Sequence, residues 1–241
     1  MLMELSTCTW SEQMLARFDI PAAMAPEIIP SDEIAGYTRG LAADGIPDGI
    51  PIAAMIGDSH GALFAQCCFA PGMAKATYGT GSSVMMNVGK KDIRSRFGLV
   101  SSVAYARGGE ITYCLEGNIN TTGGITKWMH ESLGILPEQG QAGVIAAGLP
   151  DNGGVYLVPA LAGLAAPHWR SDVRAAFVGM SAGATAAHLI RAGEEAIAYQ
   201  IADVIFAMSQ DMGAPLAGLR VDGGPTRDAF LMKFQAGLLG C

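Results

Sequence analysis

Residues Ile56–Met86 read IGDSHGALFAQCCFAPGMAKATYGTGSSVMM. The acid in this stretch, Asp58, directly follows the run Ile52–Ile56, whose continuous apolar character predicts a short buried strand. The residues after the acid, Ser59–Phe69, predict a helix that stops before a Pro-Gly pair. The stretch therefore predicts a carboxylate at a junction between a strand and a helix.

A hairpin is predicted next, because Met73–Tyr78 and Ser83–Val88 are strand-like and flank the turn Gly79-Thr80-Gly81. The rest of the chain continues to alternate. Further strands are predicted at Leu99–Tyr105, Ile111–Cys114, Val155–Val158 and Leu219–Val221, and helices at Gly123–Leu133, Ala184–Met212 and Thr226–Leu239. Strands that alternate with long helices predict the α/β class.

The composition excludes several classes of protein. Of the 241 residues 50% are hydrophobic and 15% are charged, which is ample material for a core. The net charge of −7, without any Lys/Arg cluster, argues against a nucleic-acid partner. We find no apolar run of about 18 residues, and the first residues have no basic, signal-like region. We therefore expect a cytoplasmic protein without a membrane partner.

The five cysteines are Cys8, Cys67, Cys68, Cys114 and Cys241. They lack the paired spacing of a zinc site, so reduced thiols and no protein-bound metal are expected. Cys67 and Cys68 fall inside the predicted helix Ser59–Phe69, with no histidine at a readable catalytic spacing. A cysteine hydrolase is therefore the weakest of the enzyme hypotheses.

Three glycine-rich turns are candidate anion-binding loops. Tyr78–Ser83 lies between two strands, and its N–H groups and the Thr80 hydroxyl are possible donors. Asp222–Thr226 joins a strand to a helix, and Thr122–Gly124 opens a helix, where the helix dipole favours phosphate. None of the three matches the P-loop or the dinucleotide fingerprint, so each alone is a weak signal.

The acidic residues leave two interpretations open. Asp58 is either the N-cap of its helix or an exposed carboxylate at the end of a strand, where α/β sheets bind ligands. His60 stands alone and predicts neither a metal site nor a base. Glu194 and Glu195 are adjacent on a helix and point apart, so they do not predict a catalytic pair.

The order of the motifs is more specific than any one of them. The segments Gly57–Phe64, Pro71–Lys75 and Thr77–Gly81 are followed by Val155–Ala160, Ala166–Arg170, His188–Glu195, Arg220–Gly224 and Phe230–Gln235. In this order they resemble the FGGY carbohydrate kinases, which include glycerol kinases and xylulokinases. The resemblance covers residues 10–240.

The resemblance implies an actin/hexokinase-like (ribonuclease H-like) α/β fold that binds ATP or ADP, Mg²⁺ and a sugar or polyol. It implies that residues 1–70 are the end of an N-terminal, sugar-binding domain and that residues 71–241 are a nucleotide-binding C-terminal domain. Asp58 would be the base that accepts the proton of the attacking hydroxyl, with Ser59 beside the substrate. The implied nucleotide-binding residues are Gly79, Thr80, Gly81, Gly123, Lys127, Gly223, Gly224 and Asp228.

Several positions depart from the family pattern. Ser59 and His60 stand where glycerol kinases carry Gln-Gln after the Gly-Asp pair, which argues against glycerol itself. Lys127 and Asp228 replace an expected Gln and Asn, and Gly193-Glu194 replaces a small and a large apolar residue.

An N-terminal phosphate loop of the Asp-x-Gly-Thr type is also missing from the sequence. We therefore expect a fragment that is inactive alone. The sequence is compatible with a homo-oligomer. The alternative hypothesis is a non-catalytic, actin-like nucleotide-binding or assembly module.

Overall fold

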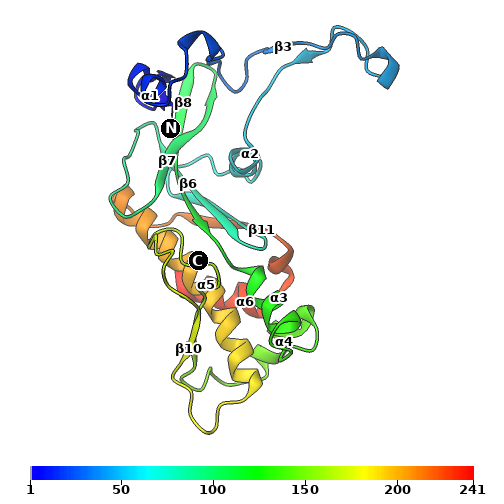
Figure 1. Cartoon of the computed structure of the whole chain (residues 1–241), viewed down its shortest axis with the longest axis vertical. Helices are drawn as coiled ribbons and strands as arrows, with labels where there is room; N and C mark the ends of the chain where they lie inside the picture. Colours follow the sequence, from blue (N-terminus) through cyan, green and yellow to red (C-terminus); the bar gives the residue numbers. More distant parts are fainter. Residues whose placement is uncertain (1) are drawn as a thin grey trace.

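A five-stranded mixed sheet organises the computed structural model, which describes residues 2–241 (Figure 1). Its strand order is β11-β5-β6-β8-β7. β11 (Gly218–Gly223) is parallel to β5 (Met73–Tyr78), whereas β6 (Ser82–Gly89), β8 (Glu110–Ile119) and β7 (Val100–Arg107) follow with antiparallel neighbours. The predicted hairpin is confirmed, and Tyr78 pairs with Ser82 across its turn.

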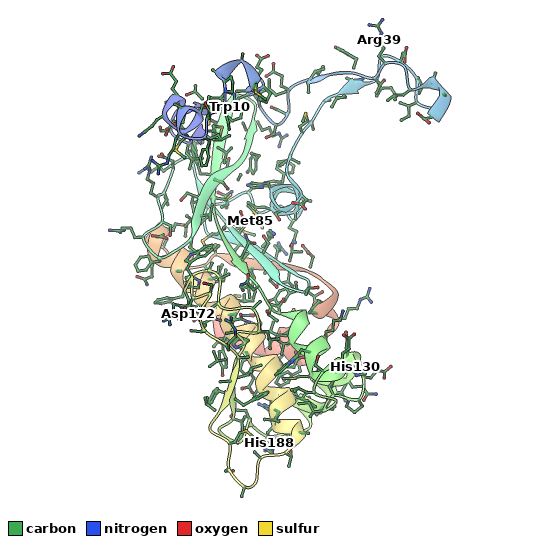
Figure 2. The ribbon with its side chains drawn as sticks, viewed as in Figure 1. Trp10, Arg39, Met85, His130, Asp172 and His188 are labelled. Carbon is green, nitrogen blue, oxygen red and sulfur yellow. The ribbon has the colours of Figure 1, made fainter. Side chains whose placement is uncertain are left out.

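The two faces of β5 have different roles, because successive side chains of a strand point to opposite sides. Ala74, Ala76 and Tyr78 belong to the main hydrophobic core. Lys75 and Thr77 alternate with them and so point to the other face. That face is covered by α2 (Asp58–Ala65), whose Leu63 packs in a smaller core that includes Met85, which Figure 2 labels beside this helix.

The main core is built around the long helix α5 (Ala186–Met212). Its predicted apolar stripe is buried at Ile190, Ile197, Ile201, Val204, Ile205 and Met208. The helix begins and ends as predicted: Thr185 forms a capping box with His188, and Gly213 terminates the helix in the left-handed conformation. Three helices pack beside α5, namely α3 (Gly123–Glu131), α4 (Ala142–Ala147) and α6 (Ala229–Leu239).

The remaining elements are short. The strands are β1 (Met3–Glu4), β2 (Thr9–Trp10), β3 (Gly36–Tyr37), β4 (Pro51–Ile52), β9 (Tyr156–Val158) and β10 (Ala176–Val178). The helical turns are α1 (Glu12–Arg17), η1 (Ala22–Met24), η2 (Ala42–Asp44), η3 (Gln139–Gln141) and η4 (Gly224–Arg227). The segment with β3 and β4 forms an arm that extends away from the sheet, with Arg39 toward its end (Figures 1 and 2).

The prediction of a buried strand at Ile52–Ile56 is wrong. Only Pro51–Ile52 is a strand, β4, and it pairs with β3 alone. Ile52, Met55 and Ile56 are 44%, 60% and 45% exposed, because this run lies on the arm and not against the sheet. An apolar run shows that a segment can be buried, but burial requires a partner surface that the run itself does not specify.

The predicted helix boundaries near Asp58 also need correction. Helix α2 spans Asp58–Ala65, so it ends four residues before Phe69. Cys67 and Cys68 lie in the turn after the helix, where Cys67 has a φ of 57° and is exposed, whereas Cys68 is fully buried. Within residues 2–241, no helix is both long enough and apolar enough to cross a bilayer.

Candidate functional site

A cleft of about 510 Å³ lies where the β5–β6 turn meets α3, α5 and the start of α6. Six of the predicted nucleotide-binding residues line it together: Gly79, Thr80, Gly123, Lys127, Gly224 and Asp228. They come from the β5–β6 turn, from α3, and from the segment between β11 and α6, so only the folded chain brings them to one place.

The β5–β6 turn is held rigidly at one end of the cleft. The N–H groups of Thr122 and Gly124 donate to the Thr80 carbonyl at 2.8 and 3.0 Å, and Gly123 N–H donates to the Gly79 carbonyl at 3.0 Å. Gly79 N–H donates to the Gly81 carbonyl at 2.8 Å. The N–H groups of the Thr122–Gly124 turn are thus occupied, and this turn supports the β5–β6 turn instead of forming an anion site of its own.

Donors for an anion remain on the β5–β6 turn itself. In the part of the chain that the structure describes, the N–H groups of Thr80 and Gly81 and the Thr80 hydroxyl donate to no acceptor. Such groups can bind a phosphate without first breaking another hydrogen bond. The chemistry of this end of the cleft therefore favours an anion.

Two predicted residues, Gly81 and Gly223, do not line the cleft. A Cβ at Gly81 would lie 2.3 Å from the Ile119 carbonyl oxygen. A Cβ at Gly223, whose φ is +100°, would lie 1.9 Å from the Tyr78 carbonyl oxygen. Both positions need glycine because another backbone segment passes close by, and that contact holds the β5–β6 turn in place.

Another wall of the cleft is formed by the segment between β11 and α6, which starts beside the β5–β6 turn and leads to Asp228. Asp228 is the N-cap of α6, and its Oδ1 accepts hydrogen bonds from the N–H groups of Phe230 and Leu231 at 2.9 and 3.0 Å. Lys127 projects from α3, with a side chain that is 58% exposed and lies 3.9 Å from Glu131. The cleft therefore has one acid held by hydrogen bonds, Asp228, and one largely exposed cation, Lys127.

Asp58 and Ser59 do not line this cleft. Asp58 is the first residue of α2, with Gly57 as the N-cap, so the interpretation of Asp58 as the cap is wrong. Its Oδ1 accepts a hydrogen bond from Ser59 N–H at 2.6 Å, and the side chain is exposed. Because α2 lies on the other face of the sheet, the Asp58 carboxylate and the cleft lie on different sides of the β5–β6 hairpin.

Comparison with known proteins decides the family. Residues 74–241 match the C-terminal domain of the FGGY family of carbohydrate kinases, and residues 1–65 match its N-terminal domain. The chain belongs to this family.

The relatives of this FGGY chain include many glycerol kinases. That of Stenotrophomonas maltophilia (strain R551-3) is 44% identical over 240 residues, and that of Methylorubrum populi (strain ATCC BAA-705 / NCIMB 13946 / BJ001) is 46% identical over 239 residues. These alignments cover 100% and 99% of the chain but 48% and 47% of the relatives. The chain therefore spans about half the length of the curated relatives it matches.

The fold agrees with solved structures of the family. The crystal structure of Plasmodium falciparum glycerol kinase with ADP matches with a TM-score of 0.92 and 34% identity, covering 98% of this chain and 47% of that one. A ligand-bound xylulose kinase from Lactobacillus acidophilus matches with a TM-score of 0.88 over 99% of this chain and 48% of that one. At 18% identity it shows the fold alone. The predicted actin/hexokinase-like fold is confirmed.

Lys75 is a residue of the FGGY chain that reasoning from the sequence missed. It is fully buried on the α2 face of β5, and its Nζ donates to Ser83 Oγ at 3.0 Å, to the Ser83 carbonyl at 3.2 Å and to Thr77 Oγ1 at 3.3 Å. Burial lowers the pKa of Lys75, and the nearby acids Asp222, Glu116 and Asp58 act in the opposite direction. The ammonium thus joins the two strands that flank the β5–β6 turn.

Glu194 is a second residue that was missed, although its departure from the family pattern is visible in the sequence. It lines the cleft, is 2% exposed, and its Oε2 has no hydrogen-bond partner among residues 2–241. Burial, with a smaller contribution from the charge of Asp228, raises the pKa of Glu194 to about 8. Glu195 points elsewhere and binds Arg191 at 2.7 Å and Asn152 at 2.9 Å, as expected for adjacent helix residues.

His60 joins a short chain of hydrogen bonds away from the cleft. Its Nε2 lies 3.1 Å from Ser102 Oγ, which lies 3.1 Å from Cys114 Sγ. Burial raises the pKa of the Cys114 thiol to about 11, so this group is a thiol and not a nucleophilic thiolate at neutral pH. The chain of contacts instead attaches α2 to the sheet.

Proposed function

We propose that the protein containing this chain transfers the γ-phosphoryl group of ATP to a hydroxyl of a sugar or polyol. The observation that carries the proposal is the cleft, which Thr80 lines with a free N–H group and which six of the predicted nucleotide-binding residues line together. A relative of known structure is described as glycerol kinase with ADP, which supports an adenine nucleotide as a ligand.

The two faces of the sheet would contribute different residues to the reaction. The nucleotide phosphates would lie at the β5–β6 turn, which phosphoryl transfer uses for positioning and charge neutralisation. Asp58 would accept the proton of the attacking hydroxyl, with Ser59 contacting the substrate. Lys75 would keep the turn in position from beneath, since its ammonium binds residues on both flanking strands.

Magnesium fits this arrangement as an ion that arrives with the nucleotide. The described residues hold no cluster of three or more His, Cys, Asp or Glu that could bind a metal by itself. Mg²⁺ in kinases is usually held by one or two carboxylates together with substrate phosphates. Asp58 and Asp222 are the acids on the α2 side of the turn, and the bound ion would neutralise phosphate charge there.

The substrate class is narrowed by the residues beside Asp58. Ser59 and His60 replace the paired glutamines of glycerol kinases, and His60 is engaged with Ser102. We propose a sugar or a polyol as the acceptor, and glycerol belongs in the tested panel because the relatives at 44% and 46% identity are glycerol kinases. We further propose that residues 1–70 belong to the substrate-binding domain and residues 71–241 to the nucleotide-binding domain.

The isolated chain should bind nucleotide without turning it over. Asp58 is exposed, so the 241-residue chain does not exclude water from its carboxylate, as a kinase must before it transfers a phosphoryl group. The cleft, in contrast, is formed entirely by residues 78–231.

The experiment has two parts. Calorimetry on the purified chain should show ADP binding, and the whole protein should phosphorylate members of a panel of polyols and ketoses. Asp58→Asn should abolish transfer and leave ADP binding intact, whereas Asp44→Asn, which changes an exposed acid on the arm, should change neither. Nucleotide binding by a whole protein without any transfer would support the non-catalytic module instead.

A further inference from the structure

We propose that Glu194 recognises the base of the nucleotide, with its uncharged carboxyl group forming a paired hydrogen bond to the Watson–Crick edge of adenine. The inference rests on the proposed binding of nucleotide in the cleft and adds a specificity-determining residue to it. It concerns a position at which this chain departs from the family pattern, which has a large apolar residue there.

The geometry points to a missing partner for Glu194. The side chain is on the third turn of α5, is 2% exposed, and lines the cleft, while its Oε2 meets no donor or acceptor in residues 2–241. A buried polar atom without a partner costs free energy, so such atoms are rare in folded proteins. A ligand in the cleft would supply the partner.

The position of Glu194 in the cleft identifies the part of the nucleotide. Phosphate is disfavoured beside Glu194, because the negative charge of Asp228 lies close by and repels an anion. The phosphates belong at the β5–β6 turn. The lining near the acids includes the apolar side chains of Ile197 and Leu231. Apolar walls with one polar group match a flat heterocyclic base.

The groups that face Glu194 favour its uncharged form. Asp228, at the start of α6, adds negative charge, and burial raises the pKa further, to about 8. Lys127 of α3 is more than half exposed and lies near Glu131, and Arg227 of η4 is exposed.

The other elements around the cleft contribute little charge. The two lining residues of η3, Gln139 and Gly140, do not titrate. Tyr78 of β5 donates its hydroxyl proton to Gln235, and burial raises its pKa. On α5 itself, Glu195 is paired with Arg191. At neutral pH the group at position 194 is therefore a neutral carboxyl.

A neutral carboxyl selects adenine by its hydrogen-bonding pattern. It offers one donor and one acceptor, which match N1 and the N6 amino group of adenine. The ionised form offers acceptors only, which match the N1–H and N2 amino donors of guanine. The protonation state of Glu194 therefore decides which base pairs with it, and raising the pH should weaken binding of adenine nucleotides.

The test measures ADP and GDP binding to the purified chain by calorimetry at pH 7 and pH 9. For the unaltered chain we expect a preference for ADP at pH 7 and a loss of ADP affinity of about tenfold at pH 9, because the carboxyl ionises within this interval. Glu194→Gln keeps a donor and an acceptor that do not titrate, so its ADP affinity should be independent of pH and its preference for ADP over GDP should persist at pH 9.

Two further variants complete the design. Glu194→Leu restores an apolar side chain and should weaken the preference for ADP. Glu138→Gln changes an exposed glutamate that does not line the cleft and should behave as the unaltered chain at both pH values. Circular dichroism confirms that each variant is folded, and Glu194→Gln, which is isosteric, carries the test if Glu194→Leu unfolds.

The outcomes separate the two proposals. ADP binding that is independent of pH in the unaltered chain and unchanged in Glu194→Gln and Glu194→Leu overturns the role of Glu194 but leaves the nucleotide site standing. Failure of the unaltered, folded chain to bind either nucleotide at either pH overturns the nucleotide site and the role of Glu194 with it. A tenfold pH effect that disappears only in the Glu194 variants supports the inference.

Discussion

Replacing Glu194 by glutamine should stabilise the protein increasingly as the pH rises, even without a ligand. In the unfolded chain Glu194 titrates near 4.5, whereas in the folded chain burial and Asp228 raise its pKa to about 8. Between these values the folded state holds a proton that the unfolded state has released. Folding stability therefore falls with rising pH in this interval and is constant again above it.

The magnitude follows from the shift in pKa. Each pKa unit corresponds to about 1.4 kcal/mol, so ionisation of Glu194 costs at most about 5 kcal/mol of stability by pH 8. Water entering the cleft would reduce this figure, and a measured effect of about 2–4 kcal/mol is a realistic expectation. Glutamine has nearly the same shape and never ionises, so the Glu194→Gln variant escapes the cost.

The assay is denaturant unfolding of both proteins at pH 5, 7 and 9. The difference in unfolding free energy between the variant and the unaltered chain removes the contributions of all other titrating groups. It should be small at pH 5, grow through pH 7 and level off above pH 8. A difference that stays constant from pH 5 to pH 9 would refute the reasoning, because Glu194 would then have the same pKa in both states.

Three further predictions concern the surroundings of the cleft. Gly223→Ala should destabilise the protein by more than about 1 kcal/mol and weaken ADP binding, because the new Cβ would clash with the Tyr78 carbonyl. Thermal melting measures the stability and calorimetry measures ADP binding, and unchanged values of the two would contradict the prediction. Glu195→Gln should cost about 3–5 kcal/mol at pH 7, because it leaves the charge of the largely buried Arg191 guanidinium without its counter-charge, and a loss below about 1 kcal/mol would argue against a buried ion pair. Folding lowers the pKa of Lys75 below 10.5, so just below that pH the unfolded chain binds more protons than the folded chain. The unfolding free energy of the unaltered chain should therefore rise relative to that of Lys75→Met as the pH approaches 10.5, and a difference that does not change with pH would refute this.

The parts of the fold that depend on local sequence were predictable. The hairpin around Gly79–Gly81 and the long helix α5 appear at almost the expected residues, because alternation, helical periodicity and caps act within one segment. The run Ile52–Ile56 failed for the opposite reason. It has the composition of a buried strand, but burial depends on which surface covers it, and in residues 2–241 that run lies on the exposed arm.

In the candidate site, too, the residues in local motifs could be predicted, whereas those that depend on tertiary packing could not. Gly79, Thr80 and Gly224 could be recognised from the sequence, since each belongs to a short glycine-rich turn next to a predicted strand. Lys75 and Glu194 could not, because a lysine in a strand and a glutamate in a helix are ordinary residues until the fold removes them from water. Their burial is a property of the assembled sheet and helices. The sequence showed only that position 194 departs from an apolar pattern. The structure shows that the side chain is a buried acid that faces the cleft without a partner. Such a group costs stability unless a ligand binds to it, which is why the position points to ligand recognition.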